Sequence, residues 1–251
     1  MHRAGLFCQE NFKLNKELAK HPLVYYLNNC SKDTKQLNLS GRCNDVLLSD
    51  SAFNILKHGS LEELRLASNK NINGITIGDV ARFVLCSTQL LILDLSDNNL
   101  GSQGASSLLG AIATNKNIKL QTLNLAKNNI DSIVPTIIDQ LFTDNRSLET
   151  LILDNNPLSL PNAQDTTLPI IFKALANNRS LTKLSLKQVN LTSHSIDILI
   201  QTLSKNQTLR ELDLGRIDDS LAKRISEGIP KTSQLQIHME SEVNHGISLL
   251  A

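Results

Sequence analysis

The chain has 251 residues, a formal net charge of +1, 20% charged residues and 3% aromatic residues, with no tryptophan. A nearly neutral chain so poor in aromatic side chains lacks the basic surface and stacking platforms of nucleic-acid-binding proteins, so we expect no nucleic-acid partner. It has no apolar run of 18 residues, and its first residues lack a signal-peptide core. We therefore expect a cytoplasmic protein that does not insert into a membrane.

The cysteine spacing gives no sign of a disulfide framework or a zinc site. The four cysteines all lie in the first third of the chain, with no paired or C-x-x-C spacing: Cys8, Cys30, Cys43 and Cys86. We expect four reduced thiols that act as small buried apolar side chains.

The first 33 residues do not share the pattern that fills the rest of the chain. Residues 13–20 and 23–28 predict two short helices, interrupted where Pro22 disfavours helix in the residue before it. We predict that residues 1–33 form a helical cap over the exposed end of the repeats that follow. A separate binding module is the alternative.

One motif recurs from residue 34 to residue 240: two apolar residues two positions apart, whose side chains leave the same face of a strand. The second members of successive pairs are separated by 27, 29, 30, 28, 33, 28 and 23 residues, which predicts about eight structural repeats. The pairs are Leu37/Leu39, Leu64/Leu66, Leu93/Leu95, Leu123/Leu125, Leu151/Leu153, Leu184/Leu186, Leu212/Leu214 and Leu235/Ile237.

Between the pairs, the apolar period changes from two to that of an α-helix. Such stripes lie at residues 48–56, 105–112, 133–142 and 196–203. One strand and one helix cannot bury both of their apolar faces, so each unit must stack on its neighbours. Strand, helix and parallel strand in this order predict an α/β solenoid with a parallel sheet on one side and helices on the other.

The repeat at residues 90–104 resembles a known family. Leu90, Leu93, Leu95, Asn98 and Leu100 follow the pattern L-x-x-L-x-L-x-x-N-x-L, and residues 95–104 read Leu-Ser-Asp-Asn-Asn-Leu-Gly-Ser-Gln-Gly. These residues resemble the ribonuclease-inhibitor type of leucine-rich repeat, which Ran GTPase-activating proteins and NOD-like receptors share. The resemblance covers residues 34–240 and implies a horseshoe arc with a concave parallel sheet and convex helices.

The resemblance also implies a structural role for the asparagine at the ninth position of the repeat. In this family its amide turns inward and bonds backbone groups in the turn after the strand, which needs both a donor and an acceptor. The matching residues form a ladder of Asn69, Asn98, Asn128 and Asn156. Arg42, Val189 and Ile217 stand at this position elsewhere, so we expect the ladder to be broken in the first repeat and in the last third.

The fifth repeat carries an insertion at residues 159–167. We expect a loop where the strand gives way to the helix. It reads either as a recognition loop or as a tolerated surface insertion.

Strand residues between and beside the apolar pairs point away from the core and form columns across the sheet. The central column reads Asn38, Arg65, Asp94, Asn124, Ile152, Ser185, Asp213 and Gln236. An aliphatic side chain gains nothing at a solvent-facing position, so Ile92 and Ile152 are candidate anchors for a partner, unless they are stray aliphatics on a solvated face. The candidate partner-binding residues are Arg65, Ile92, Asp94, Asn124, Ile152, Asp154, Lys183, Lys187 and Asp213.

Charge divides along the predicted arc. Acidic residues gather near its middle and basic residues towards its C-terminal end, which favours a partner with a complementary bipolar surface. We interpret the protein as a monomeric scaffold that binds a protein partner through the concave face and its rim. The family resemblance also permits a GTPase regulator of the Ran GTPase-activating type, or an inhibitor of a single enzyme.

The sequence contains no recognisable catalytic constellation. Its six histidines are scattered without metal-binding or nucleophile-activating spacing, and no glycine-rich phosphate loop is present. Carboxylates on a flat, wet sheet are not desolvated as acid-base catalysis requires. We expect no enzyme activity, no catalytic residue, no metal and no cofactor.

The tail, residues 241–251, is too short for another repeat and ends in the apolar residues Ile247, Leu249 and Leu250. It predicts a C-terminal cap. With Glu240 and Glu242 upstream of a leucine third from the end, the tail also resembles the type IV secretion signals of bacterial effectors. That resemblance implies export into a host cytosol.

Overall fold

The computed structural model describes residues 33–42, 60–158, 167–229, 234–241 and 247–250. Several predictions fall outside these ranges: the N-terminal helical cap up to residue 32, the apolar stripe at residues 48–56, and the insertion up to residue 166. Cys8, Cys30 and Cys43 also lie outside the described residues. The predicted domain boundaries stay predictions.

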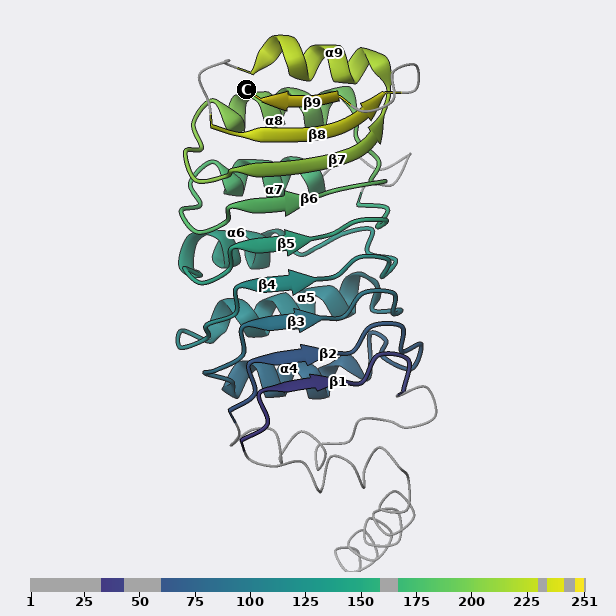
Figure 1. Cartoon of the computed structure of the whole chain (residues 1–251), viewed down its shortest axis with the longest axis vertical. Coiled ribbons are helices and arrows are strands. Elements are labelled where there is room, and N and C mark those ends of the chain that lie inside the picture. Colours follow the sequence, from purple (N-terminus) through teal and green to yellow (C-terminus); the bar gives the residue numbers. More distant parts are fainter. Residues whose placement is uncertain (1–32, 43–59, 159–166, 230–233, 242–246, 251) are drawn as a thin grey trace, which may run out of the picture.

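A single open sheet runs the length of the described chain, with its strands in sequence order (Figure 1). Strands β1 to β8 pair in parallel, and β9 pairs antiparallel with β8. The strands are β1 Gln36–Asn38, β2 Glu63–Arg65, β3 Ile92–Asp94, β4 Thr122–Asn124, β5 Thr150–Ile152, β6 Lys183–Ser185, β7 Glu211–Ile217, β8 Gln236–Ser241 and β9 Ile247–Leu250.

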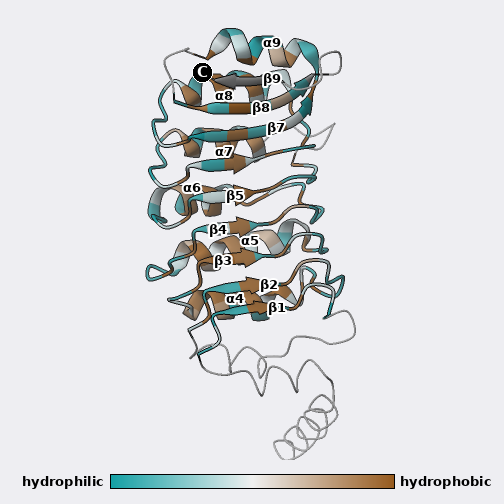
Figure 2. Ribbon diagram, viewed as in Figure 1, coloured by the Kyte–Doolittle hydropathy of each residue, from teal (hydrophilic) through white to brown (hydrophobic). Residues whose placement is uncertain are grey.

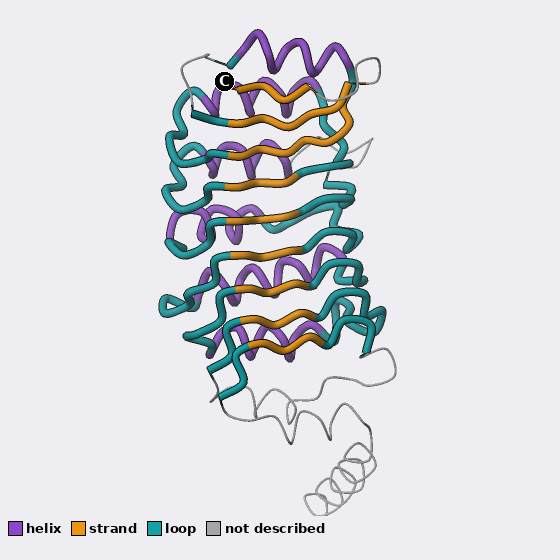
Figure 3. The backbone as a smooth tube through the Cα atoms, in the orientation of Figure 1, coloured by secondary structure: helices purple, strands orange, loops and turns teal. Residues whose placement is uncertain are grey.

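The helices lie together on one side of this sheet (Figure 3). They are α4 Ile77–Cys86, α5 Gly101–Thr114, α6 Pro135–Asp144, α7 Thr167–Leu175, α8 Ser193–Leu203 and α9 Asp219–Gly228. Each described helix from α4 to α8 returns the chain to the start of the next parallel strand, as a parallel pair requires. The predicted solenoid arc, with a concave sheet and convex helices, is confirmed.

The core is a stack of leucine columns between the sheet and the helices. In strands β2 to β5 the middle residue is buried between two more exposed neighbours, so one side chain of each strand points into the core. Hydrophobic residues recur along the stacked strands and helices (Figure 2). Leu64, Leu93, Leu123, Leu184 and Leu212 are each 0% exposed. Burying one such side chain contributes about 1.5–3 kcal/mol, so the stacked columns are the main stabilising feature of the fold.

The strand register from β1 to β7 follows the predicted columns. Asn38 pairs with Arg65, Arg65 with Asp94, and the pairing continues without a shift to Asp213. Because the side-chain period of a strand is two, this register places every predicted outward residue of these strands on the same face.

The predicted register of the last parallel strand is wrong by two residues. Leu212 pairs with Ile237 and Asp213 with His238, so His238 takes the place expected for Gln236. Leu235, Ile237 and Met239 are all buried, so alternation alone fits either register. The pairing with β7 selects one of them.

The cysteine expectation is also wrong at Cys86, the one cysteine among the described residues, whose side chain is exposed. Helix α4 buries Ile77, Val80, Phe83 and Val84. At 100° per residue, Cys86 lies about 200° around the helix from Val84, and Ser87 takes the next inward position.

Candidate recognition surface

Four ladder asparagines lie in the turn after strands β2 to β5, and all are at most 7% exposed. Asn98 shows the arrangement: its Nδ2 donates to the Leu95 carbonyl at 2.7 Å and to the Leu66 carbonyl of the preceding repeat at 3.1 Å. Its Oδ1 accepts from the Asn69 backbone N–H at 2.7 Å. Asn69, Asn128 and Asn156 likewise donate to the carbonyl of their own strand end and of the preceding repeat.

A second row of asparagines, which the sequence analysis missed, lies in the turn between helix and strand. It consists of Asn115, Asn145, Asn178 and Asn206. Each accepts backbone N–H groups two or three residues further on, as Asn178 Oδ1 does from Ser180 and Leu181 at 3.1 and 2.7 Å. The signal was present, because an asparagine stands three residues before the leucine that precedes each of the strands β5 to β7: Asn145 and Leu148, Asn178 and Leu181, Asn206 and Leu209.

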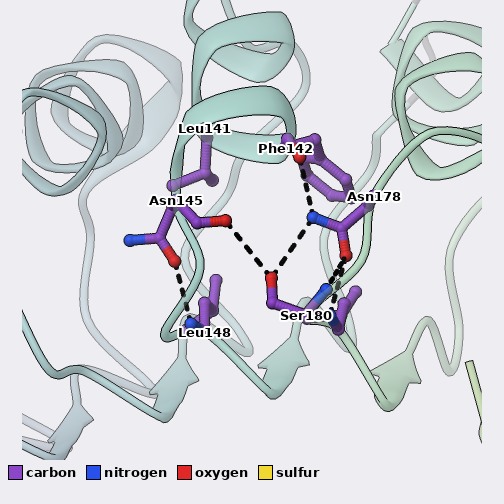
Figure 4. A pocket seen from close by; sticks show the side chains of 7 residues that line it. Leu141, Phe142, Asn145, Leu148, Asn178 and Ser180 are labelled. Atoms are coloured by element: carbon purple, nitrogen blue, oxygen red, sulfur yellow. Dashed lines mark hydrogen bonds between the residues drawn. The ribbon is translucent and has the colours of Figure 1, made fainter. Parts of the chain in front are cut away.

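The space beside this second row is small. Figure 4 shows Asn145, Asn178 and Ser180 around a pocket between neighbouring repeats, with Leu141, Phe142, Leu148 and Leu181 completing its lining. Its volume of about 10 Å³ is at the lower limit for one water molecule. A small-molecule ligand does not fit there.

On the concave face, most charged candidates pair with one another. Arg65 contacts Glu63 and lies 3.7 Å from Asp94. The Nζ of Lys183 lies 2.6 Å from the Glu211 carboxylate. The pairs Arg65–Asp94 and Lys183–Glu211 link neighbouring strands, and all three ion pairs reduce the charge available to a partner.

Lys187 forms another ion pair between neighbouring repeats. Its Nζ lies 2.7 Å from Asp213, and this hydrogen bond raises the pKa of Lys187, with smaller contributions from the charges of Asp213, Asp154 and Glu240. Lys187 is therefore a cation whose position is fixed by a carboxylate of the same chain.

Several predicted recognition side chains also bond the backbone of their own chain segment, at the end of the strand for Asp94 and Asn124 and at the irregularity inside β7 for Asp213. Asp94, Asn124 and Asp213 each accept a hydrogen bond from the backbone N–H two residues further on, at 3.0, 3.1 and 3.1 Å. Asparagine and aspartate favour this local bond at a turn. These three positions therefore have a structural role that the column pattern alone did not indicate.

Ser185 departs from the expected solvent-facing column, since it is only 4% exposed. Its hydroxyl donates to Asp154 Oδ1 at 2.6 Å, and the Lys187 N–H donates to the same oxygen at 2.9 Å. The Asp154 carboxylate therefore accepts the backbone N–H of Lys187, just after the end of β6. The Ser185 side chain is too short to accept that N–H itself.

Ile92 and Ile152 lie at outward positions near the middle of the sheet, on β3 and β5, and both are partly exposed. Neither belongs to the buried core or to the apolar residues packed against it. Thr122 lies beside Ile92, and Asn124 beside Ile152, in the pairing of β4 with its neighbours. The middle of the concave face therefore carries an uncharged patch with two aliphatic side chains.

Two family models described as leucine-rich repeats match the chain, at residues 86–109 and 119–141. The first match spans β3 and the start of α5, and the second spans β4 and most of α6, so both coincide with the repeating strand and helix. The protein is a leucine-rich repeat protein.

This leucine-rich repeat protein is similar to much longer proteins. It is 32% identical over 179 residues to "NACHT, LRR and PYD domains-containing protein 12" of Mus musculus. The aligned region covers 69% of this chain and 16% of that protein. It is 30% identical over 141 residues to protein 3 of the same description from Homo sapiens, which covers 56% of this chain and 13% of that protein. The chain thus spans less than a fifth of the length of these relatives.

Among solved structures, the leucine-rich repeat protein is similar to "Leiomodin-1 Actin-Binding Site 2 (ABS2)", with a TM-score of 0.42 and 15% identity over 83% of this chain and 95% of that one. A Caenorhabditis elegans tropomodulin C-terminal domain gives a TM-score of 0.41 and 15% identity over 73% and 90% of the two chains. Likenesses this distant do not bear on what the present protein binds.

Neither a metal site nor a membrane-spanning helix is found among the described residues. Within them, no group of three or more histidine, cysteine, aspartate or glutamate side chains is placed to hold a metal ion. None of the helices described above combines the length and apolarity needed to cross a bilayer.

Proposed function

We propose that this leucine-rich repeat protein is a scaffold that binds a protein partner through the concave face of its sheet and the adjoining rim. The observation that supports the proposal is the pair Ile92 and Ile152, which lie on the solvent-facing side of the sheet outside the apolar core. Fold stability gives no reason for aliphatic side chains there, whereas protein interfaces commonly use them as anchors.

The charged candidates contribute to the same proposal in a different way. Arg65, Lys183 and Lys187 are already paired with carboxylates of this chain, so a partner gains little by contacting them. We expect the uncharged middle of the face to supply most of the affinity and the flanking charges to orient the partner.

The test is the substitution Ile152→Glu, which places a charge in the centre of the proposed contact. We expect affinity purification with the wild-type protein to capture a specific partner from native lysate, and the variant to lose it. The matched control is Leu85→Glu, because Leu85 is an exposed apolar residue of helix α4, on the helical side of the solenoid.

Both variants should unfold at nearly the wild-type temperature, since neither side chain belongs to the core. Capture at wild-type yield by Ile152→Glu, together with loss of capture by Leu85→Glu, would place the contact on the helical side and contradict the proposal.

We propose that the protein acts as a monomer, and that it binds its partner without catalysing a reaction and without a cofactor. The earlier alternatives are separable by one assay each. A GTPase regulator must change GTP hydrolysis by one member of a panel of small GTPases, and an enzyme inhibitor must lower the activity of the protein that it captures.

We also propose a cytoplasmic site of action, with secretion into a host cytosol as a separate hypothesis that rests on the tail. Fusing the last twenty residues to a translocation reporter tests that hypothesis, because a tail that is not a signal leaves the reporter untransferred. The backbone of Ile247–Leu250 pairs with β8, so the same residues also extend the sheet.

A further inference from the structure

The second asparagine row shares a sequence signature with a covalent modification site. Asn145-Arg-Ser147, Asn178-Arg-Ser180 and Asn206-Gln-Thr208 all read Asn-x-Ser/Thr, the acceptor sequence for N-linked glycosylation. An acceptor of this kind normally lies in a surface loop. In this protein the three acceptors lie instead at the inter-repeat turns between helix and strand.

The acceptor amides are engaged inside the fold. Asn178 is 3% exposed, and its Nδ2 donates to the Phe142 carbonyl of the preceding repeat at 2.8 Å (Figure 4). Asn206 is half-buried and donates to the Leu175 carbonyl at 2.6 Å. Asn145 is 6% exposed, and its Oδ1 accepts from Leu148 N–H at 2.8 Å.

The hydroxyl residue of each signature has its own structural use. Ser180 Oγ donates to the Asn145 carbonyl at 3.3 Å, and Thr208 Oγ1 donates to the Asn178 carbonyl at 3.3 Å. Asparagine and a hydroxyl residue two positions later therefore serve the same turn. The turn chemistry accounts for the three signatures without any glycan.

Glycan transfer at these positions conflicts with that chemistry. The reaction joins sugar C1 to the asparagine Nδ2, the amide loses one proton, and the pyrophosphate of a lipid-linked oligosaccharide donor leaves. At Asn178 and Asn206 the product carries a bulky sugar on a nitrogen that lies within hydrogen-bond distance of the preceding repeat. The only space described beside Asn178 is the pocket of about 10 Å³, far smaller than a sugar.

We propose that N-glycosylation at Asn145, Asn178 and Asn206 and folding of this protein are mutually exclusive, so that the chain matures in a compartment without oligosaccharide transfer. Oligosaccharide transfer acts on unfolded acceptors. It would trap the chain in an unfolded state, because a neighbouring repeat cannot pack against a turn that carries a glycan. Asn38 and Asn190 also begin Asn-x-Ser/Thr sequences but are exposed, so a glycan there is compatible with the fold.

The experiment directs the full chain into the secretory pathway of a eukaryotic cell with an added signal peptide. We expect glycopeptide mass spectrometry to find glycan at one or more of the three buried asparagines, and the chain to be retained and protease-sensitive. The variant Ser147→Ala/Ser180→Ala/Thr208→Ala keeps the asparagines but removes the acceptors, and we expect it to be secreted in a protease-resistant form.

Two controls isolate the buried acceptors. Wild-type chain made with an inhibitor of lipid-linked oligosaccharide synthesis should regain protease resistance, which keeps the test valid even if the triple variant folds poorly. The other acceptor sequences begin at Asn29, Asn38 and Asn190. The variant Asn29→Gln/Ser40→Ala/Asn190→Gln removes them and should remain trapped. Secretion of folded wild-type chain, with the three buried asparagines either occupied or empty, overturns the proposal.

Discussion

At the scale of single residues, buried amides hold the turns of this solenoid together. Each ladder asparagine satisfies carbonyls of two repeats at once, a task that neither aspartate nor leucine can perform because it needs N–H donors. Such groups are costly to remove, since the carbonyls that lose their donor remain buried.

Asn128→Ala should therefore lower the free energy of unfolding by about 2–3 kcal/mol, because the carbonyls of Leu95 and Leu125 lose their donor. Urea denaturation measures the loss. Asn117→Ala is the matched control, since Asn117 is exposed and, among the residues that the structure describes, its side chain has no hydrogen-bond partner; its backbone N–H donates to Asn115. Equal losses for the two variants would contradict a structural ladder.

At the scale of elements, polar side chains also tie the start of α5 to the segment before α6 in the next repeat. The hydroxyl of Ser102, in the first turn of α5, donates to the Asp131 carboxylate in the segment before α6. The same oxygen accepts from the backbone N–H of Asp131 and of Ser132 at 3.1 and 3.0 Å. Hydrogen bonds from Ser102 and then Ser132 lower the pKa of Asp131 below its usual value.

This shift predicts a pH dependence. A lowered folded pKa means that the Asp131 charge stabilises the fold at pH values above the unfolded pKa of about 3.9, and that the contribution disappears as pH falls through the folded pKa. Asp131→Asn should lower the free energy of unfolding by less than about 1 kcal/mol at pH 7, because the site is partly exposed. The difference in stability between the variant and the wild type should disappear at acidic pH.

Thermal unfolding from pH 7 to pH 3 checks this expectation. In a Ser102→Ala background the same substitution should have a smaller effect at pH 7, because the main partner is already gone. A difference that stays constant down to pH 3 would show that the Asp131 charge does not contribute.

At the scale of the whole molecule, each repeat contacts only the repeats before and after it, so stability is distributed along the arc. A local defect should therefore loosen neighbouring repeats without unfolding distant ones to the same extent. This behaviour separates a solenoid from a globular domain with one core.

Leu184→Ala should cost about 2–5 kcal/mol and raise amide hydrogen exchange most in β5 to β7, whereas Leu93→Ala should raise it most in β2 to β4. Both leucines are 0% exposed at equivalent strand positions, so each is the control for the other. Hydrogen-exchange mass spectrometry reads out the two patterns. The same exchange pattern for both variants would mean that the array unfolds as one unit.

The sequence alone determined the repeat, the leucine columns and the register of β1 to β7. These follow from local rules, because a period of two in a strand and 3.6 in a helix assigns each apolar residue to a face before any neighbour is known. The ladder positions Asn69, Asn98, Asn128 and Asn156 could be chosen from the repeat resemblance for the same reason, since each stands at a constant distance from its leucine pair.

Only the tertiary structure decided which polar groups meet. His238, and not Gln236, stands in the central column, because the pairing with β7 sets the register of β8. The alternation of Leu235, Ile237 and Met239 permits both registers. Ser185 is buried because Asp154, from the preceding repeat, reaches over it. Such contacts join residues about 30 positions apart in the sequence. Their geometry depends on the distance between two stacked repeats, which no local sequence pattern determines.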